Sequence, residues 1–105
     1  MSRAIQLAST VSALAVGCAW TSVANAEVNW DLAYDYTNYG LDTSDQYCSG
    51  NGAYYSCMGA QMTDVSNYYG AEGYYYNSGD EQDTFFAAAN MCMGYAQYFF
   101  YLAQQ

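Results

Sequence analysis

The chain has 105 residues, of which ten are Asp or Glu and fourteen are Tyr; it has no His, and its only basic side chain is Arg3. Without an imidazole base, or a cation that could hold a phosphate or an oxyanion, most catalytic devices are excluded, so we expect a protein that is not an enzyme. The uncompensated negative charge also disfavours binding to nucleic acid or to an anionic membrane surface.

The first residues have the pattern of an export signal. Arg3 supplies a positive charge, an uncharged stretch covers residues 4–20, and Ala24-Asn25-Ala26 matches an A-x-A cleavage site. Removing these 26 of the 105 residues leaves 79, a single small acidic, tyrosine-rich domain over residues 27–105. We therefore expect a secreted, extracellular or periplasmic protein with no stable membrane span after cleavage.

Two other interpretations of the first residues stay open. Ala15-Val16-Gly17-Cys18 resembles a lipobox, which would make the protein a lipoprotein anchored at Cys18. An uncleaved membrane span is long enough, but its Ala, Ser and Thr content disfavours it.

Residues 28–37 alternate strictly between apolar or aromatic and mostly polar side chains. A period of two predicts an extended aromatic strand here, ended by a turn at residues 38–40. The partner of this strand would be a weaker local segment at residues 73–77 or a strand of another molecule, because strand backbone groups do not stay unpaired.

Two helices are predicted after a loop at residues 41–52. Residues 53–69 carry apolar side chains at helical spacing, and residues 81–104 form the stronger helix, with Asp80 as a candidate N-cap. The fold class predicted is mainly α, a helical hairpin of about 53–69 and 81–104 plus the N-terminal β-strand at 28–37. A small α+β fold is the alternative.

The predicted C-terminal helix is apolar over a face wider than one neighbouring helix would cover. Fourteen tyrosines also exceed what a small core can house, and tyrosine gives large contact area at low entropic cost. We expect an assembly interface formed by Trp30, Tyr34, Tyr36, Tyr74, Tyr75, Tyr76, Phe85, Phe86, Phe99 and Phe100.

Three cysteines remain after cleavage, and an exported protein meets an oxidising environment. A hairpin with its loop at residues 70–79 brings Cys57 and Cys92 level, which favours a bridge between them and leaves Cys48 as the odd thiol. A short loop closed by Cys48 and Cys57 is also allowed. The leftover sulfur is either free or bridges to another subunit.

No cofactor is expected from the acidic clusters. Asp80, Glu81 and Asp83 are weak calcium candidates, as is the group at residues 42–45, but neither matches an EF-hand loop. The simpler interpretation is that solvated carboxylates keep an aromatic-rich chain soluble.

Cys92-Met93-Gly94-Tyr95, within the last helix and downstream of another cysteine, resembles the C-x-G-Y element of Tai-type periplasmic immunity proteins. The similarity covers roughly fifteen residues. It implies a disulfide-linked helical protein that binds and neutralises one partner.

Together these patterns favour an exported, non-enzymatic structural protein. We expect it to self-associate through aromatic contacts into an extracellular fibre, filament, coat or matrix, with further copies of itself as partners. The alternative is a small periplasmic, disulfide-linked helical binding or immunity protein that engages a basic partner.

Overall fold

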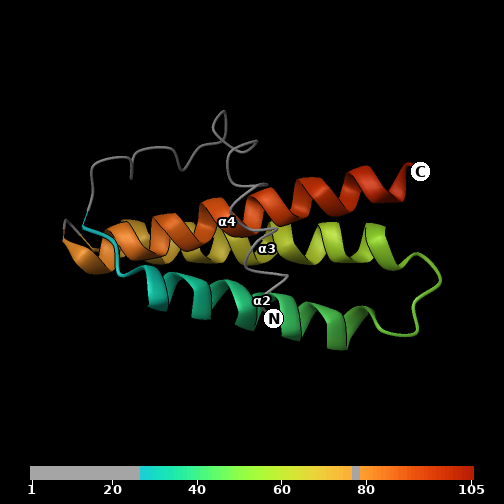
Figure 1. Ribbon diagram of the computed structural model, residues 1–105, viewed down its shortest axis with the longest axis horizontal. Helices are drawn as coiled ribbons and strands as arrows, with labels where there is room; N and C mark the ends of the chain where they lie inside the picture. The colour runs from blue at the N-terminus through green and yellow to red at the C-terminus, as the bar shows by residue number, and fades with distance from the viewer. Residues whose placement is uncertain (1–26, 77–78) are drawn as a thin grey trace.

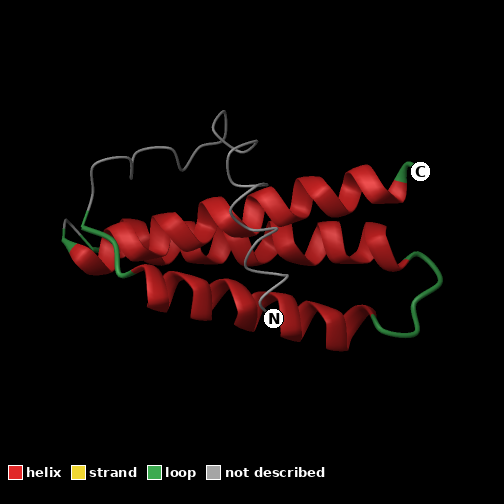
Figure 2. Ribbon diagram, in the orientation of Figure 1, coloured by secondary structure: helices red, strands yellow, loops and turns green. Residues whose placement is uncertain are grey.

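The computed structural model describes residues 27–76 and 79–105, and the export signal expected over residues 1–26, with Cys18, lies outside them. These ranges form three α helices and no strand: α2 (Trp30–Cys48), α3 (Tyr54–Tyr75) and α4 (Asp80–Ala103). The helices run side by side with alternating direction, so that α4 lies along α3 and α2 lies beside both (Figure 1). Coloured by secondary structure, the described chain is helix joined by short loops (Figure 2).

The predicted strand at 28–37 is wrong, because most of it is the first part of α2. The side chain of Asn29 caps this helix by accepting a hydrogen bond from the backbone N–H of Leu32 at 3.1 Å. Apart from Leu41, the residues that α2 buries are small or weakly polar, and they recur at helical spacing: Ala33, Thr37, Gly40, Ser44 and Cys48. Of the large side chains that gave the alternating pattern, Trp30 and Leu32 are exposed, whereas Val28, Tyr34 and Tyr36 are partly buried against the core.

The predicted helical hairpin is confirmed, with different ends. The first helix extends six residues beyond the predicted end, to Tyr75, and the loop predicted at 41–52 is mostly helix because α2 continues to Cys48. The cap of α4 is Gly79, with a φ of 99°, rather than Asp80. Asp80 instead begins the helix, where the helix dipole favours a carboxylate.

Small residues let the three helices approach closely. A Cβ atom on Gly40 would lie 2.8 Å from Cγ1 of Val65, so α2 and α3 could not keep this spacing with a larger residue there. Between α3 and α4, the Ser66 hydroxyl donates to the carbonyl of Ala89 at 2.8 Å. The core around these contacts contains Met58, Met62, Tyr69, Phe86, Met91, Cys92 and Tyr95 together with several alanines.

The apolar face of α4 is therefore largely covered by its own chain, contrary to what the width of that face suggested. Ten of its residues are buried, from Thr84 to Ala96. Among the described residues, no helix combines the length and the apolar character needed to cross a bilayer.

Candidate functional site

A groove follows the seam between α2 and α3. It consists of two depressions, of about 480 and 230 Å³, that share Tyr39, Tyr68 and Tyr69. Its lining comes from α2 (Leu32, Asp35, Tyr36, Tyr39, Gly40, Thr43), α3 (Gln61, Asp64, Val65, Tyr68, Tyr69, Glu72) and the start of α4 (Phe85). The α2–α3 groove thus spans twelve residues of α2, from Leu32 to Thr43, about 16 Å of helix.

Tyrosine rings form much of the groove wall. Tyr39 and Tyr68 lie opposite one another on α2 and α3 and are 67% and 61% exposed, so their ring faces are open to a ligand. Such faces attract apolar groups and cations.

The floor at one end of the groove is an aromatic cluster of Tyr36, Tyr69, Tyr76 and Phe85. The ring of Phe85 stacks on Tyr36 with centroids 5.0 Å apart and on Tyr76 at 5.9 Å. Tyr69 joins the cluster from α3 and donates its hydroxyl proton to the carbonyl of Tyr36 at 2.9 Å. Burial raises the pKa of Tyr69, so its hydroxyl stays a donor well into alkaline pH.

Three carboxylates stand around the groove: Asp35 on α2 and Asp64 and Glu72 on α3. Asp35 and Asp64 are exposed and Glu72 is half-buried. Residues 27–76 and 79–105 contain no Lys, Arg or His, so none of these carboxylates has a basic side chain of the described chain as a partner. The groove therefore combines aromatic surface with negative charge that no basic side chain of the described residues neutralises.

The two helices place these groups by a shared spacing. Asp35 and Tyr39 are four residues apart on α2, and Asp64, Tyr68 and Glu72 follow one another at four-residue intervals on α3. Residues four apart lie on one face of a helix, so each helix presents a stripe of acids and tyrosines to the same seam.

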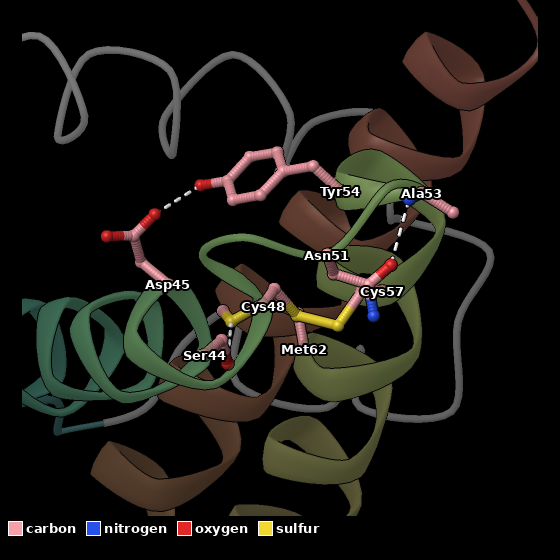
Figure 3. Close-up of a disulfide and its surroundings, with 8 residues drawn as sticks. All are labelled: Ser44, Asp45, Cys48, Asn51, Ala53, Tyr54, Cys57 and Met62. Atoms are coloured by element: carbon pink, nitrogen blue, oxygen red, sulfur yellow. Dashed lines mark hydrogen bonds between the residues drawn. A yellow bond between two sulfur atoms is a disulfide. The ribbon is translucent and has the colours of Figure 1, made fainter.

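The opposite end of the molecule is closed by a disulfide between Cys48, the last residue of α2, and Cys57, near the start of α3 (Figure 3). In the same region Tyr54 donates a hydrogen bond to the Asp45 carboxylate, and Ser44 contacts the sulfur of Met62 at 3.4 Å. The bond to Asp45 raises the pKa of Tyr54 to about 12. Covalent and polar links thus fix the turn between α2 and α3.

The predicted Cys57–Cys92 bridge is wrong, because the two cysteines do not lie at the same level along the α3–α4 hairpin. Cys57 lies eighteen residues before the end of α3 at Tyr75, and Cys92 lies twelve residues after the start of α4 at Asp80. The offset of six residues is about 9 Å along the helices, more than a disulfide spans. The alternative pairing of Cys48 with Cys57 is the one observed.

Cys92 is a free thiol and fully buried. Burial raises its pKa to about 12, so it stays a thiol and does not act as a nucleophile. Gly94 and Tyr95 of the same C-x-G-Y element are also buried, which makes this element part of the core of the described chain.

The aromatic residues predicted to form one assembly interface are distributed over both ends of the bundle. Tyr36, Tyr76 and Phe85 join the aromatic cluster, Trp30 packs against Tyr34 near it, and Tyr74 and Tyr75 are 65% and 83% exposed at the end of α3. Phe86 lies in the core, whereas Phe99 and Phe100 lie near the C-terminal end of α4. The structure does not bring these ten residues together on one face.

The calcium candidates occupy the first turn of α4. Within the described residues no three acidic or cysteine side chains converge in a way that could hold a metal ion, and this includes Asp80, Glu81 and Asp83. Instead, Asp80 shares a hydrogen bond with Glu27, and this contact raises the pKa of Glu27.

Sequence analysis missed the groove residues Asp35, Tyr39, Asp64, Tyr68 and Glu72. The four-residue spacing of acids and tyrosines was a usable signal, but it has meaning only if residues 30–48 are helical, and a strand was predicted for part of them.

Comparison with known protein families, with curated proteins and with solved structures finds no match to this chain in any of the three.

Proposed function

We propose that the protein is an exported, non-enzymatic binding protein, a disulfide-tied helical bundle that engages a basic partner. The observation that carries this proposal is the α2–α3 groove, in which tyrosine rings and carboxylates stand together and no described residue is a Lys, Arg or His that could pair with them. A basic partner would supply the missing cations and cover the exposed rings at the same time.

The closed body of the bundle supports a binding role over a structural one. The three helices cover one another's apolar faces, and α2 occupies the place of the strand that was expected to pair with another molecule. A rigid body loses little conformational entropy when a partner docks on it.

The test is the association of the purified, oxidised protein with basic and acidic polypeptides, followed by analytical ultracentrifugation at about 0.15 M salt. We expect saturable binding of polylysine, weakened as salt is raised, and no binding of polyglutamate. A protein that sediments unchanged with polylysine at this salt concentration does not have the proposed function.

Self-association into an extracellular fibre, coat or matrix is the second candidate, and the exposed rings of Tyr74 and Tyr75 favour it. Because each copy is strongly acidic, such assembly would need protons, calcium or salt to lower the repulsion. Sedimentation at neutral and acidic pH, with and without calcium, tests this candidate. Identical profiles in all four conditions would count against it.

A further inference from the structure

We propose that the α2–α3 groove binds an arginine-bearing segment of the partner protein, with guanidinium groups stacked on Tyr39 and Tyr68 and paired with Asp35, Glu72 and Asp64. This inference rests on the proposed function and adds the place and the chemistry of recognition. It makes the groove, rather than the acidic surface as a whole, the specific site.

The arrangement of the three carboxylates defines two positions for positive charge. The antiparallel helices α2 and α3 are in register where Tyr69 bonds to Tyr36 and where Gly40 meets Val65. By this register Asp35 and Glu72 stand near the same end of the groove, and Asp64 stands six to eight residues away, about 9 to 12 Å. Two cationic side chains of one short segment can reach both positions.

The tyrosines select the kind of cation. A guanidinium is planar, pairs with a carboxylate through two hydrogen bonds and stacks on an aromatic face, whereas an ammonium is a compact, strongly hydrated charge. Tyr39 and Tyr68 expose their rings beside the carboxylates, at the junction of the two depressions. The groove therefore favours arginine over lysine.

The described residues of a second copy do not offer the positive charge that the groove requires, because residues 27–76 and 79–105 contain no Lys, Arg or His. Placing two such acidic grooves against each other would add repulsion. Charge complementarity thus points to a different, basic protein.

The experiment compares the binding of hexa-arginine and hexa-lysine peptides to the oxidised protein by isothermal titration calorimetry at about 0.15 M salt. We expect hexa-arginine to bind more tightly. Tyr39→Ala and Tyr68→Ala should each weaken hexa-arginine about two- to five-fold and bring its affinity closer to that of hexa-lysine, because an exposed cation–π contact is lost. Asp35→Asn combined with Glu72→Gln should weaken both peptides.

Matched controls lie on α2 outside the groove lining. Tyr47 is 71% exposed, so Tyr47→Ala matches the tyrosine changes, and Asp42 is also exposed, so Asp42→Asn shows the effect of removing one carboxylate outside the groove. Both variants should bind like the wild type, and circular dichroism should show that all variants remain folded.

Three outcomes separate the two proposals. If the groove variants lose the preference for hexa-arginine over hexa-lysine and the control variants keep it, the groove is supported as the site. Equal binding of the two peptides, or equal effects of groove and control variants, overturns the groove site but leaves a basic partner for the protein as a whole. Failure of both peptides to bind removes the proposed function together with this inference.

Discussion

The two ends of the bundle are held by different means. At the disulfide end, a covalent bond joins Cys48 and Cys57 across the short turn between α2 and α3. At the aromatic end, rings from all three helices stack around Phe85, the backbone N–H of Asn29 donates to the Thr84 hydroxyl, and the Gln82 amide donates to backbone carbonyls at the end of α3. No ion pair of basic and acidic side chains contributes at either end of the described bundle, since its residues include no Lys, Arg or His.

This difference shows how a small acidic domain can be stable without salt bridges. A disulfide acts mainly by restricting the unfolded chain, whereas an aromatic cluster acts by burying apolar surface in the folded state. The groove begins at the aromatic end and runs toward the disulfide end, so both kinds of link hold its walls.

The largest effect is expected from Tyr69→Ala at the aromatic end. Tyr69 is 6% exposed, and its loss removes ring contacts with Tyr36 and Phe85 and leaves a cavity. We expect the free energy of unfolding, measured by urea denaturation, to fall by about 3 to 5 kcal/mol. Tyr69→Phe, which removes only the hydroxyl, should cost about 1 kcal/mol. If Tyr69→Ala lowered the free energy of unfolding by less than about 1 kcal/mol, the stabilising role given to the aromatic cluster would be contradicted.

A smaller loss is expected when the disulfide end is opened by replacing Cys48 and Cys57 with Ala. The bond closes a loop with a sequence separation of nine, for which chain entropy predicts about 2.6 kcal/mol. Hydrogen exchange should then rise near residues 45–57 before it rises around Tyr69, because the aromatic end keeps its own contacts. Uniform loss of protection along α2 would show that the two ends are not independent.

The first helix, α2, was harder to predict from the sequence than α3 and α4. The helices α3 and α4 were predicted, with bounds of about 53–69 and 81–104, because large apolar side chains recur there at helical spacing. In α2 the buried stripe is Ala33, Thr37, Gly40 and Ser44, which a hydrophobicity pattern counts as neutral or polar. The exposed Trp30 and Leu32 dominated the pattern and gave a false period of two.

The candidate site was predictable only in its chemistry. The excess of tyrosine and of negative charge indicated a basic partner as an alternative function, but not where it binds. The groove depends on the register of α2 against α3, which is set by the contact of Gly40 with Val65 and by the Cys48–Cys57 bond. Such contacts between helices leave no periodic signal in a single sequence.

Two glycines on α3 provide a closer comparison of the ends. A Cβ atom on Gly73 would lie 2.5 Å from the ring of Phe86, which is buried, and one on Gly59 would lie 2.6 Å from the ring of Phe100, which is 40% exposed. Gly73→Ala should therefore lower the free energy of unfolding by about 1 to 3 kcal/mol. Gly59→Ala should change it by less than about 1 kcal/mol, because Phe100 can move outward and alanine favours the helix. Thermal denaturation of the two variants, measured side by side, tests this difference. Equal losses of stability in the two variants would contradict it.

The smallest effect concerns the pH dependence of the aromatic end, where Glu27 shares a hydrogen bond with Asp80. This contact raises the pKa of Glu27 above its ordinary value of 4.5, so the folded chain holds a proton more tightly than the unfolded chain. The resulting stabilisation is fully present below about pH 4.5 and is lost as pH rises through the folded-state value. The difference in melting temperature between the uncleaved wild type and Glu27→Gln should therefore change between pH 7 and pH 4.5, whereas that between wild type and Asp42→Asn should change less.

Cleavage after Ala26 offers a control that acts on the same contact. It would place the α-ammonium of Glu27 close to Asp80 in the folded chain, where its positive charge offsets the negative charge that raises the pKa of Glu27, whereas its effect on its own carboxylate is also present in the unfolded chain. The gain in stability at low pH should then shrink or vanish in a chain that begins at Glu27. If the stability of the cleaved and uncleaved chains depended on pH in the same way, the Glu27–Asp80 contact would not be the source of that dependence. This contact would then not count among the interactions that hold the aromatic end.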